Sequence, residues 1–134
     1  MTLGFIDPRF CGGFVSILAI DCDKAASASY AKNFGNHAVC GDIEKRIIGR
    51  YAIPKANIVI GGPPCQGFSL LNKGRMEDAR RALWQPYMDI VEMCKASMFV
   101  IENVQGLLES PEHKAITKRA EELGFYTVGT LKRS

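Results

Sequence analysis

Short apolar runs alternate with amphipathic stretches along the 134 residues of this chain. Short runs rich in β-branched and aromatic side chains predict buried strands. Strands are expected at 14–21, 37–42, 56–62, 97–103 and 125–131. Helices are expected at 24–34, 44–51, 80–96 and 111–124, the third becoming regular near Pro86. Asp23 and Pro111 are expected to start two of these helices, and Gly35 and Gly124 to end them.

This alternation predicts parallel strands joined by right-handed crossovers, and therefore an open, doubly wound α/β sheet of Rossmann-like type. Ligands of such sheets bind at the carboxyl ends of the strands. Four places meet that condition: Asp21, Asp42, the segment 62–69 and the pair Glu102–Asn103. Three of these strand ends carry a carboxylate and one carries a cysteine. They are the first candidates for a functional site.

Composition narrows the class of protein. Apolar residues make up 47% and charged residues 23%, as in an ordinary one-domain globular protein. No apolar run approaches the ~20 residues that span a bilayer, and the start of the chain lacks the pattern of a secretory signal. We therefore expect a cytoplasmic protein with no membrane partner. The net charge of +3 permits nucleic-acid binding without arguing for it.

The cysteines fit a reducing compartment. Their number is odd and no Cys-x-x-Cys spacing occurs, so neither a disulfide framework nor a metal site is expected. We expect Cys22, Cys40 and Cys94 to be buried and inert, which is the usual state of a free cysteine. The five cysteines are Cys11, Cys22, Cys40, Cys65 and Cys94.

Cys65 differs from the others because it follows a predicted strand, within "GGPPCQGFS" (61–69). Pro63 and Pro64 stiffen this segment, and Gly61 and Gly62 allow a ligand or backbone to approach closely. Such a loop would fix the direction of the thiol at the ligand edge. A helix beginning nearby would favour the thiolate. Cys65 is therefore a candidate nucleophile.

Glu102 ends the apolar run "FVIEN" at the next ligand-facing strand end. A carboxyl that is partly removed from water can hold a proton near neutral pH. An acid beside a nucleophile suits addition to an electron-poor ring, in which the thiolate attacks carbon while the acid hydrogen-bonds or protonates a ring nitrogen. A strand-end glutamate turned to solvent is the alternative interpretation.

"GGPPCQGFS" followed by "FVIENV" resembles the DNA cytosine-5 methyltransferases. The segments "AIDCDKAASASYAKNFG" (19–35), "GDI" (41–43) and "RMEDARRALWQPYMDIV" (75–91) are also similar to that family. The resemblance extends from about residue 14 to residue 131. It implies DNA as substrate, S-adenosylmethionine as cofactor and a place in restriction–modification, in a prokaryotic or phage setting.

The resemblance also implies roles for single residues. Cys65 would add to C6 of a cytosine, and Glu102 would engage N3 and the exocyclic amine. Asn103 and Pro64 would order the cysteine loop, and the target base would leave the duplex to reach it. The cofactor side would consist of Asp21 at the ribose, Asp42 at the adenine amine, and Cys22, Ile43, Pro63 and Leu83. The substrate side of the loop would consist of Gln66, Gly67, Phe68 and Ser69.

The chain departs from the family pattern at both ends. Only ten residues separate Phe10 from Asp21, whereas a parallel crossover needs about a dozen, so no helix fits. Either "LGFI" (3–6) is not the first strand or the first strand–helix unit is shortened. The chain also stops after "YTVGTLKRS" (126–134), before the family's arginine motif, target-recognition region and last helix. We expect residues 1–134 to be a partial catalytic domain, weak or inactive without a complementing C-terminal segment.

Other functions stay open on the sequence. The same motifs fit an RNA cytosine-5 methyltransferase acting on transfer RNA. A non-catalytic remnant that binds a partner or a second chain is a further interpretation. A thiol hydrolase using Cys65 would need a nearby histidine, and neither His37 nor His113 falls at a predicted ligand-side strand end.

Overall fold

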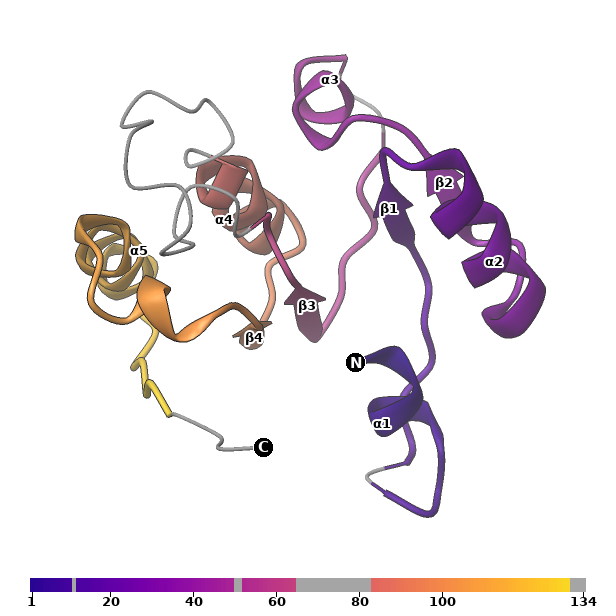
Figure 1. The fold of residues 1–134 in the computed structure, drawn as a ribbon, viewed down its shortest axis with the longest axis horizontal. Coiled ribbons are helices and arrows are strands. Elements are labelled where there is room, and N and C mark those ends of the chain that lie inside the picture. The colour runs from indigo at the N-terminus through magenta and orange to yellow at the C-terminus, as the bar shows by residue number, and fades with distance from the viewer. Residues whose placement is uncertain (11, 50–51, 65–82, 131–134) are drawn as a thin grey trace.

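The computed structural model describes residues 1–10, 12–49, 52–64 and 83–130 (Figure 1). Helices and strands alternate along the chain, as the hydrophobic pattern predicted. The elements in order are α1 (Thr2–Ile6), β1 (Ala19–Asp21), α2 (Lys24–Phe34), β2 (Ala38–Cys40), α3 (Ile43–Ile48), β3 (Ile58–Gly61), α4 (Trp84–Met93), β4 (Met98–Ile101), the 3-10 helix η3 (Gln105–Leu107) and α5 (Pro111–Glu122).

The strands are parallel, which confirms the α/β fold class, but they form two separate pairs. β1 pairs with β2 and β3 pairs with β4. Figure 1 shows the pairs side by side, with α2 beside β1 and β2, α4 beside β3, and α5 beside α4. We call β1 to α3 the N-terminal part and β3 to α5 the C-terminal part.

The first strand is shorter than predicted. Residues 14–18 of the expected strand 14–21 have no regular structure, and only Ala19–Asp21 pairs with a neighbour. A strand requires a partner for its backbone groups, and β2 (Ala38–Cys40) offers only three residues. Among the described residues, no strand joins β1 to β3, so the sheet is interrupted where the continuous sheet was expected.

The helix boundaries in the N-terminal part follow local capping, as predicted. Asp23 accepts a hydrogen bond from Ala26 N at 2.7 Å at the start of α2. Gly35 ends α2 with a φ of 111°, a conformation that favours glycine. α3 begins after Asp42, whose Oδ1 accepts from Glu44 N and Lys45 N. Asp42, predicted as a ligand contact, therefore also caps a helix.

The hydrophobic core lies in the C-terminal part. α4 begins at Trp84, close to the predicted start, and buries Met88 and Val91 completely. Met93, the last residue of α4, is 40% exposed. The core cluster consists of Tyr87, Met88, Val91, Leu107, Ile116 and Ala120. In the described N-terminal part Ser27 is the buried side chain, so most apolar packing lies on one side of the molecule.

The predicted last strand is wrong for the residues that the structure describes. Residues 125–130 have no strand pairing, although Phe125 packs edge-on against Phe99 of β4 with ring centroids 5.1 Å apart. Tyr126 and Val128 are 92% and 78% exposed. The composition of the segment is typical of a strand, but no described strand pairs with it.

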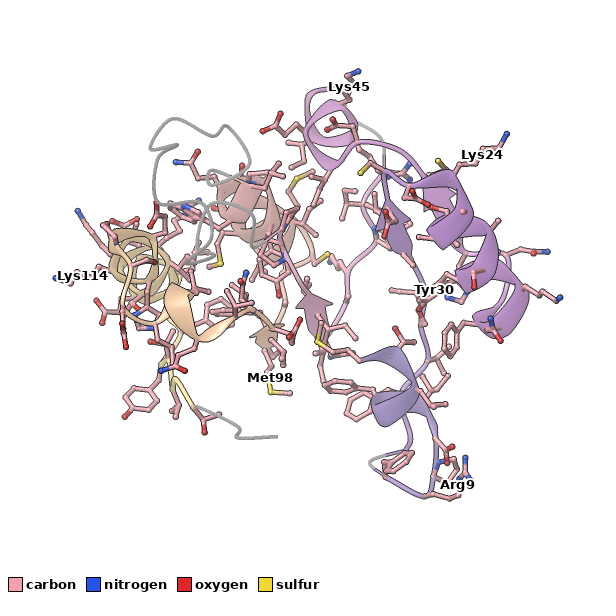
Figure 2. The ribbon with its side chains drawn as sticks, viewed as in Figure 1. Arg9, Lys24, Tyr30, Lys45, Met98 and Lys114 are labelled. Carbon is pink, nitrogen blue, oxygen red and sulfur yellow. The ribbon has the colours of Figure 1, made fainter. Side chains whose placement is uncertain are left out.

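The N-terminal segment is held to α2 by hydroxyl groups. "LGFI" lies in α1, so it is not a strand, and no helix occurs among the described residues between Phe10 and Asp21. Tyr30 points from α2 toward the segment that leads into β1 (Figure 2). Its hydroxyl lies 2.9 Å from Ser16 Oγ and donates to Thr2 Oγ1 at 3.2 Å. These contacts join α1 and the segment before β1 to α2.

Candidate active site

The ends of β3 and β4 bring two predicted site segments together. Glu102 N donates to Gly61 O at 2.9 Å, which extends the parallel pairing past β4. Asn103 Nδ2 donates to Pro63 O at 2.9 Å. Its Oδ1 accepts from Val104 N at 2.9 Å, so both ends of the amide are held. The residue before Pro64 is therefore bonded to the segment that carries Glu102.

Glu102 lies against Gly62. A Cβ atom at Gly62 would be 3.4 Å from Glu102 Oε2, so a larger residue there would contact the carboxylate. The Glu102 side chain is exposed, whereas partial burial was anticipated for an acid of this kind. Cys65 and the loop residues Gln66, Gly67, Phe68 and Ser69 lie outside the described residues. The structure thus describes the chain up to the residue before the candidate nucleophile.

Tyr87 of α4 supports this strand end from below. Its ring occupies the space beside Gly61, where a Cβ atom would be 2.5 Å from Cε2. Its hydroxyl donates to Val59 O at 3.1 Å and Val100 O at 3.0 Å, so one proton is shared between β3 and β4. Burial raises the pKa of this phenol well above its usual value of 10.0. Tyr87 thus ties together the strands that carry the two candidate segments.

A cavity of about 700 Å³ lies between β1 and β3. Its size falls within the range of roughly 300–1,000 Å³ that is usual for small-ligand sites. Residues 14–22 and 58–64 line its two sides, and α1 lines one end. All six residues predicted for the cofactor side line this single cavity, and they come from both parts of the molecule: Asp21, Cys22, Asp42, Ile43, Pro63 and Leu83.

Asp21 is suitably placed at the end of β1 to accept hydrogen bonds. Ser27 Oγ donates to Asp21 O at 3.1 Å, and Gly41 N donates to the same oxygen at 2.9 Å, so the backbone is fixed. The carboxylate is exposed and its Oδ1 accepts from Asp23 N at 2.8 Å. Within the described chain Oδ2 has no donor. A ligand hydroxyl in the cavity could supply one.

Two of the cysteines predicted to be buried are exposed. Cys22 and Cys40 are free and exposed, and Cys40 Sγ lies 3.8 Å from Cys22 O. They lie at strand ends, where the short strands leave no layer to cover them. Cys94 is buried, as predicted, and burial raises the pKa of its thiol.

Sequence reasoning missed the role of Tyr87 and misread that of Gly61. The glycine pair was interpreted as room for a ligand, but the ring of Tyr87 fills the space at Gly61. A local pattern contains no signal for this, because the two residues are 26 positions apart. The available hint was an aromatic residue within the helix predicted after this strand.

The described part of the chain offers neither a metal site nor a membrane-spanning helix. No group of three or more His, Cys, Asp or Glu side chains there could hold a metal ion. No helix in the described part is long and apolar enough to cross a membrane.

Parallel strands whose ends carry carboxylates, joined through helices, define a protein of the α/β class, in which ligands usually bind at the carboxyl ends of the strands. A family model narrows this class further. The model of the C-5 cytosine-specific DNA methylases matches residues 1–131, and the chain belongs to that family. The resemblance read from the two motifs is thereby confirmed.

Curated relatives agree with this family. The Type II methyltransferase M.AgeI of Thalassovita gelatinovora is 38% identical over 124 residues, which cover 84% of this chain and 29% of the relative. The Type II methyltransferase M.XorII of Xanthomonas oryzae is 37% identical, over 97% of this chain and 32% of the relative. The Type II methyltransferase M.NgoFVII of Neisseria gonorrhoeae is 36% identical, over 85% and 32%. The chain spans about a third of the length of these relatives.

Proposed function

We propose that this chain contributes the catalytic edge of an enzyme that methylates C5 of cytosine in DNA. One observation carries the proposal: the Asn103 amide joins the segment preceding Cys65 to the segment carrying Glu102, with Asn103 Nδ2 2.9 Å from Pro63 O. Cys65 itself is assigned from its motif. Membership of the C-5 cytosine-specific DNA methylase family supports DNA as the substrate class.

In this proposal Cys65 adds to C6 of a cytosine that has left the duplex. Glu102 hydrogen-bonds N3 and the exocyclic amine of that base. C5 then becomes a carbon nucleophile. After methyl transfer, loss of the C5 proton and expulsion of the Cys65 thiolate restore the ring. Asn103 and Pro64 hold the loop in place throughout.

In this proposal the cavity between β1 and β3 would hold S-adenosylmethionine, which would supply an electrophilic methyl group. Asp21 would accept from the ribose hydroxyls through its open Oδ2. Asp42 is engaged as a helix cap through Oδ1 and would offer its other oxygen to the adenine amine. Cys22 and Ile43 would flank these acids, and Pro63 and Leu83 would close the side next to the catalytic edge.

We further propose that residues 1–134 act as part of a catalytic domain with a shortened first strand–helix unit. The interruption between β1 and β3 supports this. A C-terminal segment supplied separately would then complement the chain. The free thiols of Cys22, Cys40 and Cys94 are consistent with a reducing intracellular setting.

The test is covalent trapping on a duplex that contains 5-fluorocytosine, in the presence of S-adenosylmethionine. The chain is assayed alone and with the remaining C-terminal portion of M.AgeI. We expect an adduct that is lost in Cys65→Ala and retained in Cys40→Ala, the matched exposed cysteine. Asn103→Ala should reduce the adduct yield. Absence of an adduct under both conditions contradicts the proposal, and an adduct only with 5-fluorocytosine transfer RNA replaces DNA by RNA as the substrate.

A further inference from the structure

Two exposed thiols lie at the carboxyl ends of neighbouring strands, beside the cavity. Cys40 is the last residue of β2, and Cys22 follows the last residue of β1. Asp21 and Cys40 are register partners in the parallel pair. The last hydrogen bond between the strands runs from Gly41 N to Asp21 O at 2.9 Å. The two cysteines flank this bond, one on each strand.

The spacing of these cysteines suits a disulfide. Neighbouring strands lie about 4.8 Å apart and one residue advances about 3.3 Å, so the Cα atoms of Cys22 and Cys40 would be about 6 Å apart if Cys22 continued the line of β1. Disulfides join Cα atoms about 4.4–6.8 Å apart. Cys40 Sγ already lies 3.8 Å from the backbone oxygen of Cys22. Cys22 lies in a bend beyond the strand, outside the ladder, so its side chain can turn without breaking the strand pairing.

We propose that Cys22 and Cys40 form a redox-active thiol pair whose disulfide fixes the cavity-lining bend at Cys22. Oxidation removes one proton from each sulfur, forms one S–S bond and passes two electrons to an oxidant such as an uncharged azo compound, which becomes a hydrazine. An uncharged oxidant suits the site because Asp21 and Asp23 flank Cys22 in the sequence and Asp42 follows Cys40 by two residues. The disulfide ties the bend that follows Asp21 to the end of β2.

The consequence for ligand binding rests on the proposed function. Cys22 lines the cavity together with Asp21, Asp42 and Ile43. A cofactor there would cover the Cys22 thiol and slow its oxidation. Conversely, the disulfide would restrict the Asp21–Asp23 turn and weaken the binding of the cofactor.

The experiment oxidises the folded chain with diamide and maps the products by tryptic digestion and mass spectrometry. Trypsin leaves Cys11 and Cys22 on one peptide, residues 10–24, and Cys40 on residues 33–45. A Cys11→Ser background therefore makes the linkage unambiguous. We expect these two peptides to be joined as the dominant product, and the joined product to disappear on reduction. Cys22→Ser and Cys40→Ser should each abolish it without changing the circular dichroism spectrum.

The outcomes separate the thiol pair from the cofactor proposal. If the dominant disulfide joins other cysteines, or if Cys22 and Cys40 remain as free thiols while the chain is folded, the pair is refuted. If the Cys22–Cys40 disulfide forms and S-adenosylmethionine slows it severalfold, both proposals are supported. If it forms at the same rate with and without S-adenosylmethionine, the thiol pair stands and the assignment of the cavity to the cofactor is contradicted.

Discussion

The contact between Gly61 and Tyr87 predicts that Gly61→Ala destabilises the chain strongly. The added Cβ would be 2.5 Å from Cε2 and 2.9 Å from Cδ2 of a ring that is only 6% exposed. Overpacking a core of this kind costs about 1–3 kcal/mol. A ring that moves aside also weakens its hydroxyl bonds to Val59 and Val100, which costs about 1 kcal/mol more.

Gly62→Ala is the matched control. Its Cβ would meet Glu102 Oε2 at 3.4 Å, close to an ordinary contact, and neither glycine has a positive φ. Both substitutions restrict the unfolded chain equally, by about 0.4–1 kcal/mol in favour of folding, so that effect cancels between them. We expect Gly61→Ala to be about 2–4 kcal/mol less stable than Gly62→Ala, or roughly 10 °C in Tm.

Urea unfolding followed by the fluorescence of Trp84 measures this difference, because Trp84 is the single tryptophan and packs against the core cluster. Adding Tyr87→Leu to Gly61→Ala removes the ring that the new Cβ would meet. The double variant should therefore lose less stability than the sum of the losses measured for the two single variants. If Gly61→Ala and Gly62→Ala unfold within about 0.5 kcal/mol of each other, which is the usual scatter of surface substitutions, the steric argument fails.

Three further outcomes are expected. Tyr87→Phe should cost about 1 kcal/mol at neutral pH. Because burial raises the pKa of the Tyr87 phenol above 10.0, the native chain should lose stability as pH rises through 10, where the phenol of the unfolded chain ionises. Urea titrations at pH 8 and 10.5 should show that the variant lacks this part of the loss. Ser110→Ala should lower stability by about 1–2 kcal/mol in thermal melts, because Ser110 caps α5 and its buried Oγ donates to Leu107 O at 2.7 Å. Arg119→Gln should cost under about 1 kcal/mol, and less in 1 M NaCl, since its 2.6 Å pair with Glu92 is partly exposed; a larger, salt-independent cost would show that the pair is not the main role of Arg119.

The sequence was sufficient for features determined by neighbouring residues. The caps Asp23 and Ser110 act within one helical turn, although only the former was predicted, and the strand ends at Asp21 and Glu102 follow from abrupt changes of polarity. Within the β3–β4 pair, the rule for parallel strands was enough to place Glu102 beside Gly61.

Features that depend on distant partners could not be predicted in this way. Residues 14–18 and 125–130 have strand-like composition, but strand formation depends on a neighbour, and the described chain brings none to them. The exposure of Cys22 and Cys40 has the same origin, since it depends on how little structure covers two three-residue strands. The bonds of Tyr87 to both β3 and β4 likewise depend on the tertiary arrangement.

The one-sided core has a consequence for how the chain responds to heat, denaturant and hydrogen exchange. The C-terminal part contains the fully buried apolar side chains, whereas the N-terminal part relies on helix caps and a three-residue strand pair. Amides of α2 and β2 should therefore exchange through local opening well before those of α4 and α5. A molecule bound between β1 and β3 would contact both parts, and its binding energy would add to their mutual stability. A ligand bound between β1 and β3 would occupy the place where the sheet is interrupted. The affinity for a cofactor there would therefore depend on how completely the N-terminal part is folded, and binding would in turn stabilise that part.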